Sequence, residues 1–238
     1  MALTADALIA DPPQLHGVSI EGRLHQWTLG PEALAALDRL LEPGWKTLET
    51  GAGASTVLFA LKQTEHTCVV PSPEEIDRIK SYCATHGVST DTVKFVAEFS
   101  EDALPHLPPN PLDLVLIDGS HSFPSVFIDF HYATRRLRAG GWLFIDDTHL
   151  WTGRTLRNFL QAEEDWALDQ DIHFRTAIFR KRSGNAEISN WIYQPYVVAH
   201  SAFTPWQRVM TMVREGDWRL LAEKLASRVR GALRTRSR

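Results

Sequence analysis

The chain has 238 residues, of which 44% are hydrophobic, enough to bury one sizeable α/β core and too few for two full domains. Its net charge is −4, but residues 219–238 hold seven Lys or Arg against the single acidic Glu223, so the remainder carries −10. An acidic body of this kind argues against a nucleic-acid partner.

The N-terminal stretch and the cysteines indicate a cytoplasmic protein. MALTADALIADPPQ has no basic region and reaches Asp6, Asp11 and two prolines before any long apolar run, unlike a secretory signal. No segment has the length of a transmembrane helix. Cys68 and Cys83 are too few for a disulfide framework and lack zinc-ligand spacing, so we expect core thiols in a reducing compartment.

Strand-like and helix-like segments alternate from residue 31 to residue 182, which is typical of a parallel sheet covered by helices on both faces. The first expected helix begins at Pro31 and places Leu34, Leu37 and Leu41 on one face. The next elements are strands at 45–50, 66–70, 92–98 and 112–118, with a short helix after the first strand and a longer helix at 73–87.

The second half of the core continues this alternation. The helix after the fourth strand has an expected face of Phe127, Phe130, Thr134 and Leu137. Residues 139–141, Ala-Gly-Gly, are expected to end it before a fifth strand at 142–146. A helix at 154–165 and two strands at 166–172 and 175–182, which we expect to form a hairpin, complete the core.

A glycine-rich turn follows the first of these core strands. LETGAGAST places Glu49 at the strand end, Gly51 and Gly53 in the turn, and Ser55 and Thr56 at the start of a helix. Glycine allows a sharp turn and the close approach of a ligand. A dinucleotide-binding turn would need a third glycine where Thr56 stands, which argues against hydride transfer. A purely structural turn is the alternative.

Glu-x-Gly-x-Gly-x-Ser-Thr resembles motif I of the class I S-adenosylmethionine-dependent methyltransferases, and the order of elements around it, roughly residues 31–182, is similar to theirs. The resemblance implies that Glu49, Gly51 and Gly53 bind the methionine end of the cofactor. Ser55 and Thr56 would cap the start of the helix. The implied fold is α/β: a Rossmann-like, seven-stranded, mostly parallel sheet with helices on both faces, an antiparallel edge hairpin and helical N- and C-terminal additions.

The second strand departs from the family pattern. Val70 stands where the family usually has an acidic residue that binds the ribose hydroxyls, and Ser72 or Glu74 is a candidate substitute. Residues 99–101 resemble the segment that frames the adenine, which makes Ser100 and its neighbours Phe99 and Glu101 cofactor candidates. Ser100 as an ordinary helix cap is the alternative.

Three carboxylates follow two later strands. Asp118 ends the fourth strand, and Asp146 and Asp147 end the fifth, at the edge where parallel sheets bind ligands. Crowded carboxylates raise one another's pKa values, and a divalent cation relieves the repulsion. Oxygen ligands favour magnesium, manganese or calcium over zinc.

Asp118-Gly-Ser-His121, followed by Asp146-Asp147, resembles the metal-dependent O-methyltransferases, especially the branch of macrolide-sugar O-methyltransferases and cephalosporin-hydroxylase-like proteins. The resemblance implies that the three aspartates hold Mg²⁺ and that His121 is the general base. A metal lowers the pKa of a bound hydroxyl, and histidine can accept its proton near pH 7. The alternatives are a turn at Asp118, a helix cap at Asp147 and a surface loop at His121.

The resemblance divides the chain into three parts. These are an N-terminal lid or helix region at 1–44, the methyltransferase core at 45–182 and a helical appendage at 183–238. The appendage ends in an amphipathic basic helix, whose apolar residues are Trp218, Leu221, Leu225, Val229 and Leu233. Packing on the body or on a second subunit is favoured over membrane-surface binding. His25 and Trp27 are candidates for the lid, and His149 and Trp151 for the acceptor pocket.

The expected function is methyl transfer from S-adenosylmethionine to a hydroxyl of a small molecule, a sugar or natural product, with assistance from Mg²⁺. Two alternatives remain open: a cofactor-binding relative that is metal-free or catalytically silent, and a hydroxylase-associated binding protein. The expected partner is a small-molecule hydroxyl acceptor, with no nucleic acid and no membrane span. A homo-oligomer is left open.

Overall fold

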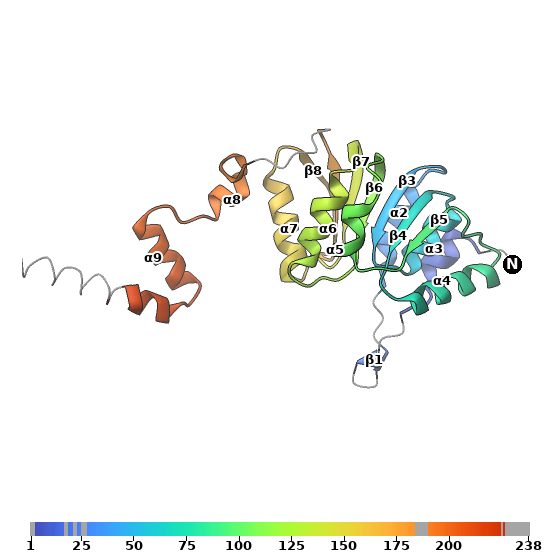
Figure 1. Ribbon diagram of the computed structural model, residues 1–238, viewed down its shortest axis with the longest axis horizontal. Coiled ribbons are helices and arrows are strands. Elements are labelled where there is room, and N and C mark those ends of the chain that lie inside the picture. The colour runs from blue at the N-terminus through green and yellow to red at the C-terminus, as the bar shows by residue number, and fades with distance from the viewer. Residues whose placement is uncertain are drawn as a thin grey trace, which may run out of the picture. The chain divides into compact units, whose positions relative to one another are not determined.

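The computed structural model describes residues 3–16, 19–20, 23–24, 28–183, 190–224 and 226. They belong to two compact units, Met1–Ser189 and Asn190–Arg238 (Figure 1). The lid candidates His25 and Trp27 lie outside the described residues, as do Leu225, Val229 and Leu233 of the expected basic helix.

The first unit is built on a seven-stranded sheet with the order β5-β4-β3-β6-β7-β9-β8. The strands are β3 (Lys46–Thr50), β4 (Glu65–Val69), β5 (Val93–Val96), β6 (Leu112–Ile117), β7 (Leu137–Ile145), β8 (Trp166–Ile172) and β9 (Thr176–Lys181). β5, β4, β3, β6 and β7 run parallel, and β9 pairs antiparallel with both β7 and β8. The expected mostly parallel sheet with an edge hairpin is therefore confirmed.

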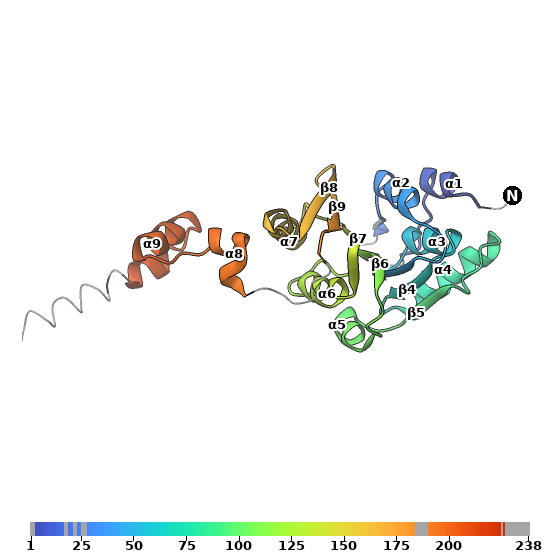
Figure 2. The ribbon, with the colours of Figure 1, turned by 90° about the horizontal axis from the view of Figure 1, so that it is seen from above.

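Helices cover both faces of this sheet (Figure 2). One face carries α1 (Ala5–Ala10), α2 (Pro31–Leu40), α3 (Ala54–Leu61) and α4 (Pro73–Thr85). The other carries α5 (Ser100–Ala103), the short η1 (Leu104–His106), α6 (Ser125–Thr134) and α7 (Trp151–Ala162). A small ribbon of β1 (Ser19–Ile20) and β2 (Arg23–Leu24) lies between α1 and α2 in the sequence.

The central strands are apolar on both sides because both faces are covered. In β6, Leu114 and Leu116 join the core under α3 and α4, whereas Val115 and Ile117 join the core under α6 and α7. This arrangement explains why the strand reads as a continuous apolar run in the sequence. Cys68 and Cys83 are both free and buried in the first of these cores, as expected.

The buried face of α6 matches the expected one only in part. Thr134 is buried and Phe127 and Phe130 pack against the core, as expected, but Val126, Asp129 and Ala133 are buried more deeply than the two phenylalanines. Both sets have helical spacing, so periodicity alone did not decide which one faces the sheet. The structure therefore places a carboxylate, that of Asp129, in the interior.

The boundary after α6 was also predicted incorrectly. Leu137, expected on the helix, begins β7 and pairs with Leu112, so Gly140 and Gly141 lie inside the strand. Pairing with β6 extends β7 backwards. A register shift between Leu112 and Leu114 accommodates the irregular backbone around Gly140, whose φ is +73°.

The second unit is helical in its described part. It contains η2 (Trp191–Tyr193), α8 (Pro195–Ala199), α9 (Pro205–Arg214) and a further helical segment at 218–224. Thr204 and Gln207 form a capping box at the start of α9. None of the helices in the described part of the chain is long and apolar enough to cross a bilayer.

Truncating a side chain of the central sheet should destabilise the fold. Phe144 lies in β7 between β6 and β9 and is fully buried. We expect Phe144→Ala to lower the free energy of unfolding by about 3–5 kcal/mol, because it removes apolar contacts and leaves a cavity. Urea denaturation measures this change. Phe174→Ala, at a side chain that is 73% exposed, is the control and should cost about 0.5 kcal/mol or less. Equal losses in the two variants would contradict this packing.

Candidate active site

The carboxyl ends of three neighbouring strands meet at one edge of the sheet. Thr50 of β3 pairs with Ile117 of β6, which in turn pairs with Ile145 of β7. The residues that follow therefore lie side by side, and the Asp118 amide donates to the Thr50 carbonyl at 3.0 Å. The glycine turn and the expected carboxylates thus share this edge.

Gly51 is required by the close approach of two backbone segments. Its φ is +89°, and a Cβ built on it would lie 2.2 Å from the Asp118 carbonyl oxygen. Only glycine fits such a position. The turn therefore places the β3 loop directly against the residue that begins the Asp118–His121 loop.

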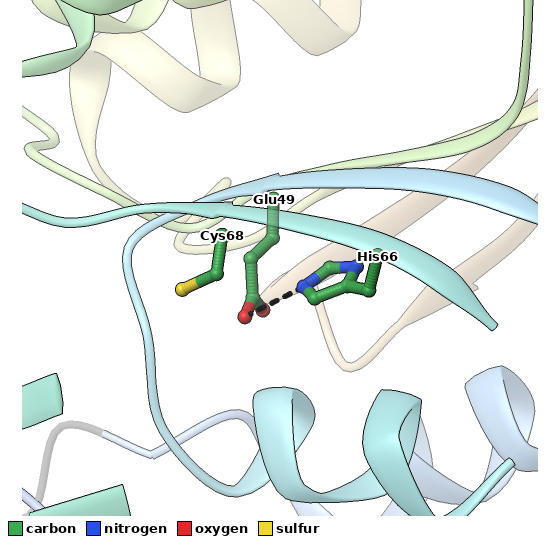
Figure 3. A group of neighbouring side chains, drawn as sticks. All are labelled: Glu49, His66 and Cys68. Carbon is green, nitrogen blue, oxygen red and sulfur yellow. Dashed lines mark hydrogen bonds and ion pairs between the residues drawn. The ribbon is translucent and has the colours of Figure 1, made fainter. Parts of the chain in front are cut away.

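The Glu49 side chain points from β3 toward α3 and lies between Cys68 and His66 of β4 (Figure 3). It is fully buried and accepts hydrogen bonds from Ser55 Oγ at 2.7 Å, from the Thr56 hydroxyl and from His66 Nε2 at 3.1 Å. Thr56 Oγ1 also accepts from the Gly53 amide at 3.0 Å. Through these hydrogen bonds, the buried Glu49 holds the loop and the start of α3 in place.

His66 and Cys68 of β4 complete this network. The His66 ring stacks on Phe59 with centroids 4.0 Å apart, and its Nδ1 is 2.8 Å from Thr47 Oγ1. Burial, together with the charge of Glu49, raises the pKa of the Cys68 thiol well above its usual range, so it stays protonated. The thiol points at the Gly51 carbonyl, with the sulfur 3.4 Å from the oxygen.

Glu49, His66 and Cys68 could also be considered as metal ligands. In the described part of the chain they form the one group of three or more His, Cys, Asp or Glu residues whose ligand atoms all lie within 4.8 Å of one another. However, the Glu49 carboxylate already accepts three hydrogen bonds, and both ring nitrogens of His66 have hydrogen-bond partners. We therefore interpret the group as a hydrogen-bond network.

The sequence-predicted base lies among the predicted metal ligands. His121 Nε2 is 3.1 Å from Asp147 Oδ2 and 3.8 Å from Asp118 Oδ1. Thr152, at the start of α7, donates to the His121 carbonyl at 2.6 Å and so positions the loop. The four residues Asp118, His121, Asp146 and Asp147 are thus brought to one place.

Burial and neighbouring carboxylates raise the pKa values of Asp118 and Asp146. Burial, followed by the charges of Asp146 and Asp147, raises the pKa of Asp118 well above its usual range. Burial also raises the pKa of Asp146, although the hydroxyl of Thr176, which donates to Asp146 Oδ1, opposes the rise. A set of carboxylates that repel one another suits a hard divalent cation with oxygen ligands. The ligand atoms of the three aspartates lie farther apart than those of Glu49, His66 and Cys68, which are within 4.8 Å of one another.

One alternative for Asp147 is wrong. Leu150, not Asp147, is the N-cap residue of α7, and it makes no side-chain cap. Asp147 instead has a φ of +50°, and its carboxylate faces His121, His149 and Arg175. Its side chain is therefore free of a capping role.

The structure also places the remaining cofactor candidates. Ser72 is the N-cap of α4, accepting from the Glu75 amide at 3.2 Å and donating to Glu74 at 3.0 Å. Val70 is buried at the end of β4. Ser100 is the first residue of α5, and the cap position is Phe99, so the cap alternative for Ser100 is wrong.

Three polar residues near this edge, His16, Glu75 and Asp129, were not predicted from the sequence. His16 lies against Gly53, with its Nε2 3.1 Å from where a Cβ on that glycine would be, and its Nδ1 is 3.3 Å from Glu75 Oε1. Burial raises the pKa of Asp129 to about 6, and the hydroxyls of Ser100 and Thr50 oppose the rise. No motif marks these positions, because tertiary packing brings them together.

Exposed aromatic side chains flank the His121 loop. Phe123 is 70% exposed and Trp151 is 58% exposed, and their ring centroids are 6.3 Å apart. Both lie close to His121, since Phe123 follows it by two residues and Trp151 precedes the Thr152 that bonds its carbonyl. An apolar surface therefore adjoins the carboxylates.

Residues 48–148 match a family model described as a methyltransferase domain. This range includes both the glycine turn and the aspartates after β6 and β7. No curated protein matches the chain.

Solved structures share the fold at low sequence identity. The O-methyltransferase TomG from Streptomyces achromogenes, in complex with S-adenosylmethionine, is 17% identical, with a TM-score of 0.57 over 67% of this chain and 84% of that one. A putative O-methyltransferase from Klebsiella pneumoniae is 15% identical, with a TM-score of 0.51 over 63% and 77%. A putative rRNA methylase from Clostridium thermocellum is 12% identical, with a TM-score of 0.52 over 63% and 94%.

These likenesses establish the architecture, and the family model identifies the domain that carries the glycine turn. Residues 48–148 therefore match a methyltransferase domain, and the sheet around them has the fold of the solved methyltransferases.

Proposed function

We propose that this protein transfers the methyl group of S-adenosylmethionine to a hydroxyl oxygen of a small molecule, a sugar or natural product, with the assistance of Mg²⁺. The observation that carries the proposal is the position of His121, whose Nε2 lies 3.1 Å from Asp147 and 3.8 Å from Asp118 at the strand ends beside the glycine loop. A base, a carboxylate cluster and a cofactor loop at one sheet edge suit proton removal next to a methyl donor.

His121 is the proposed general base. With Nε2–H donating to Asp147, the lone pair of the neutral ring is on Nδ1, which takes the proton of the acceptor hydroxyl. Asp147 orients the ring and stabilises the positive charge that forms. The attacking oxygen must lie in line with the sulfonium methyl, so the loops around Gly51 and His121 set the geometry of transfer.

Asp118, Asp146 and Asp147 are the residues proposed to hold the metal. A bound magnesium ion would lower the pKa of the acceptor hydroxyl and neutralise the carboxylates. Burial and, after it, the charges of Asp146 and Asp147 raise the pKa of Asp118. The second cause supports this role, because a cation relieves that repulsion. The exposed rings of Phe123 and Trp151 supply an apolar surface for the acceptor.

The proposal includes a small-molecule acceptor and a cytoplasmic location. A similar fold occurs in a putative rRNA methylase, but the charge of −10 outside residues 219–238 argues against an RNA acceptor. A catalytically silent, cofactor-binding relative is the second candidate. The buried, apolar Val70 at the end of β4 favours it, because no carboxylate there binds the ribose.

Replacing the base should slow turnover without weakening cofactor binding. We expect His121→Asn to lower kcat about 10²- to 10⁴-fold on an acceptor that the wild type methylates, because the hydroxyl proton is no longer removed. Radiolabelled methyl transfer measures kcat, and calorimetry with S-adenosylmethionine should show an unchanged Kd. The control is His173→Asn, at a side chain that is 76% exposed, which should leave kcat unaltered. A His121→Asn enzyme of near wild-type kcat would remove His121 from the mechanism.

Metal removal tests the carboxylate cluster. EDTA should abolish turnover and Mg²⁺ should restore it, because the acceptor hydroxyl would otherwise keep its high pKa. Asp118→Asn should raise the Mg²⁺ concentration needed for half-maximal activity by about tenfold or more, and titration with Mn²⁺ followed by electron paramagnetic resonance should show the same weakening. Full activity in EDTA would mean that the carboxylates are structural.

A further inference from the structure

The end of β4 lacks the acidic residue that a ribose site needs. In nucleotide-binding α/β folds, a carboxylate about 20 residues beyond the glycine turn binds the ribose hydroxyls. Here β4 ends on Val69 and is followed by Val70, and both residues are buried and apolar. Three polar residues follow it within the next turn of chain: Ser72, Glu74 and Glu75.

We propose that Glu75, oriented by His16, binds the ribose hydroxyls of S-adenosylmethionine in place of a strand-end carboxylate. This inference rests on the assignment of the cofactor. It concerns residues from the first turn of α4 and from the N-terminal segment, and it gives that segment a role in the cofactor site.

Glu75 is the one of the three that contacts His16, the residue that lies against Gly53 of the glycine loop. Ser72 is engaged as the N-cap of α4, and Glu74 is fully exposed and paired with Ser72. The Glu75 side chain is only 15% exposed. Its charge contributes, after burial and Glu49, to the raised pKa of Cys68, whose sulfur lies 3.4 Å from the Gly51 carbonyl oxygen.

His16 connects Glu75 to the loop. Its Nδ1 is 3.3 Å from Glu75 Oε1, while its Nε2 lies 3.1 Å from the position of a Cβ on Gly53. Arg78 of α4 holds the N-terminal segment in place by donating to the Leu15 carbonyl at 2.6 Å. The imidazole therefore sits between the glycine turn and the Glu75 carboxylate.

The chemistry of the pair suits a vicinal diol. A carboxylate offers about four lone-pair sites. His16 and, at 3.9 Å, Arg78 both contact Oε1, so the two lone pairs of Oε2 remain for the ribose hydroxyls. Hydrogen bonds to a charged acceptor are stronger than those to a neutral one. His16 is a positioning residue in this account, since it acts through Glu75.

The proposal is tested by measuring how a change in Glu75 alters the affinity for two ligands that differ by one ribose hydroxyl. Calorimetry would compare S-adenosylhomocysteine with its 2′-deoxy analogue on the wild type and on Glu75→Gln. We expect Glu75→Gln to weaken S-adenosylhomocysteine about 10- to 100-fold and to leave the 2′-deoxy analogue, which has already lost a ribose hydroxyl, much less affected. His16→Asn should give a smaller loss with the same preference. Glu74→Gln is the matched control and should bind both ligands like the wild type.

Equal losses for both ligands, or no loss with either, would overturn the inference. Circular dichroism melting confirms that each variant is folded before its affinities are compared. The measurement requires no methyl transfer. It therefore separates failure of the ribose assignment from failure of the proposed O-methylation, which turnover assays detect in a protein that binds the cofactor normally.

Discussion

The buried carboxylate of Glu49 is the constraint on which the cofactor edge depends. An ionised carboxylate without partners in a protein interior costs several kcal/mol, so it persists only where donors surround it. Here Ser55, Thr56 and His66 supply those donors from α3 and β4. The same contacts that make the burial tolerable also fix the loop between β3 and α3.

The effect of this network extends to the chemistry. Thr56 binds the Gly53 amide, and Gly51 packs against the Asp118 carbonyl, so the cofactor loop and the His121 loop share one rigid support. A catalytic arrangement must be held by groups that are themselves fixed, because small displacements of reacting atoms reduce rate strongly. In this protein the support is the buried hydrogen-bond network around Glu49.

The sequence predicted the fold well because most of its signals are local. The apolar run of β6, the glycine turn at Gly51 and the paired segments of the edge hairpin each carry their own pattern, and the structure has them where expected. The boundary between α6 and β7 was missed because strand pairing with Leu112 overrode the helical spacing that includes Leu137.

The site was only partly predictable for the same reason. Asp118, His121, Asp146 and Asp147 follow strands that end at one edge, so their proximity follows from topology. His16 and Glu75 meet only through the path of the N-terminal segment, and no spacing rule relates them. The sequence suggested that Glu49 lies near the cofactor, but its burial depends on the hydroxyls and the imidazole that surround it.

The most direct test of this account is a crystal structure of the full chain with S-adenosylhomocysteine. We expect the ligand to lie over residues 51–53, while the Glu49 carboxylate keeps its hydrogen bonds to Ser55, Thr56 and His66. A Glu49 side chain that leaves this network to contact the ligand, or a ligand bound away from the carboxyl ends of β3 and β6, would contradict it.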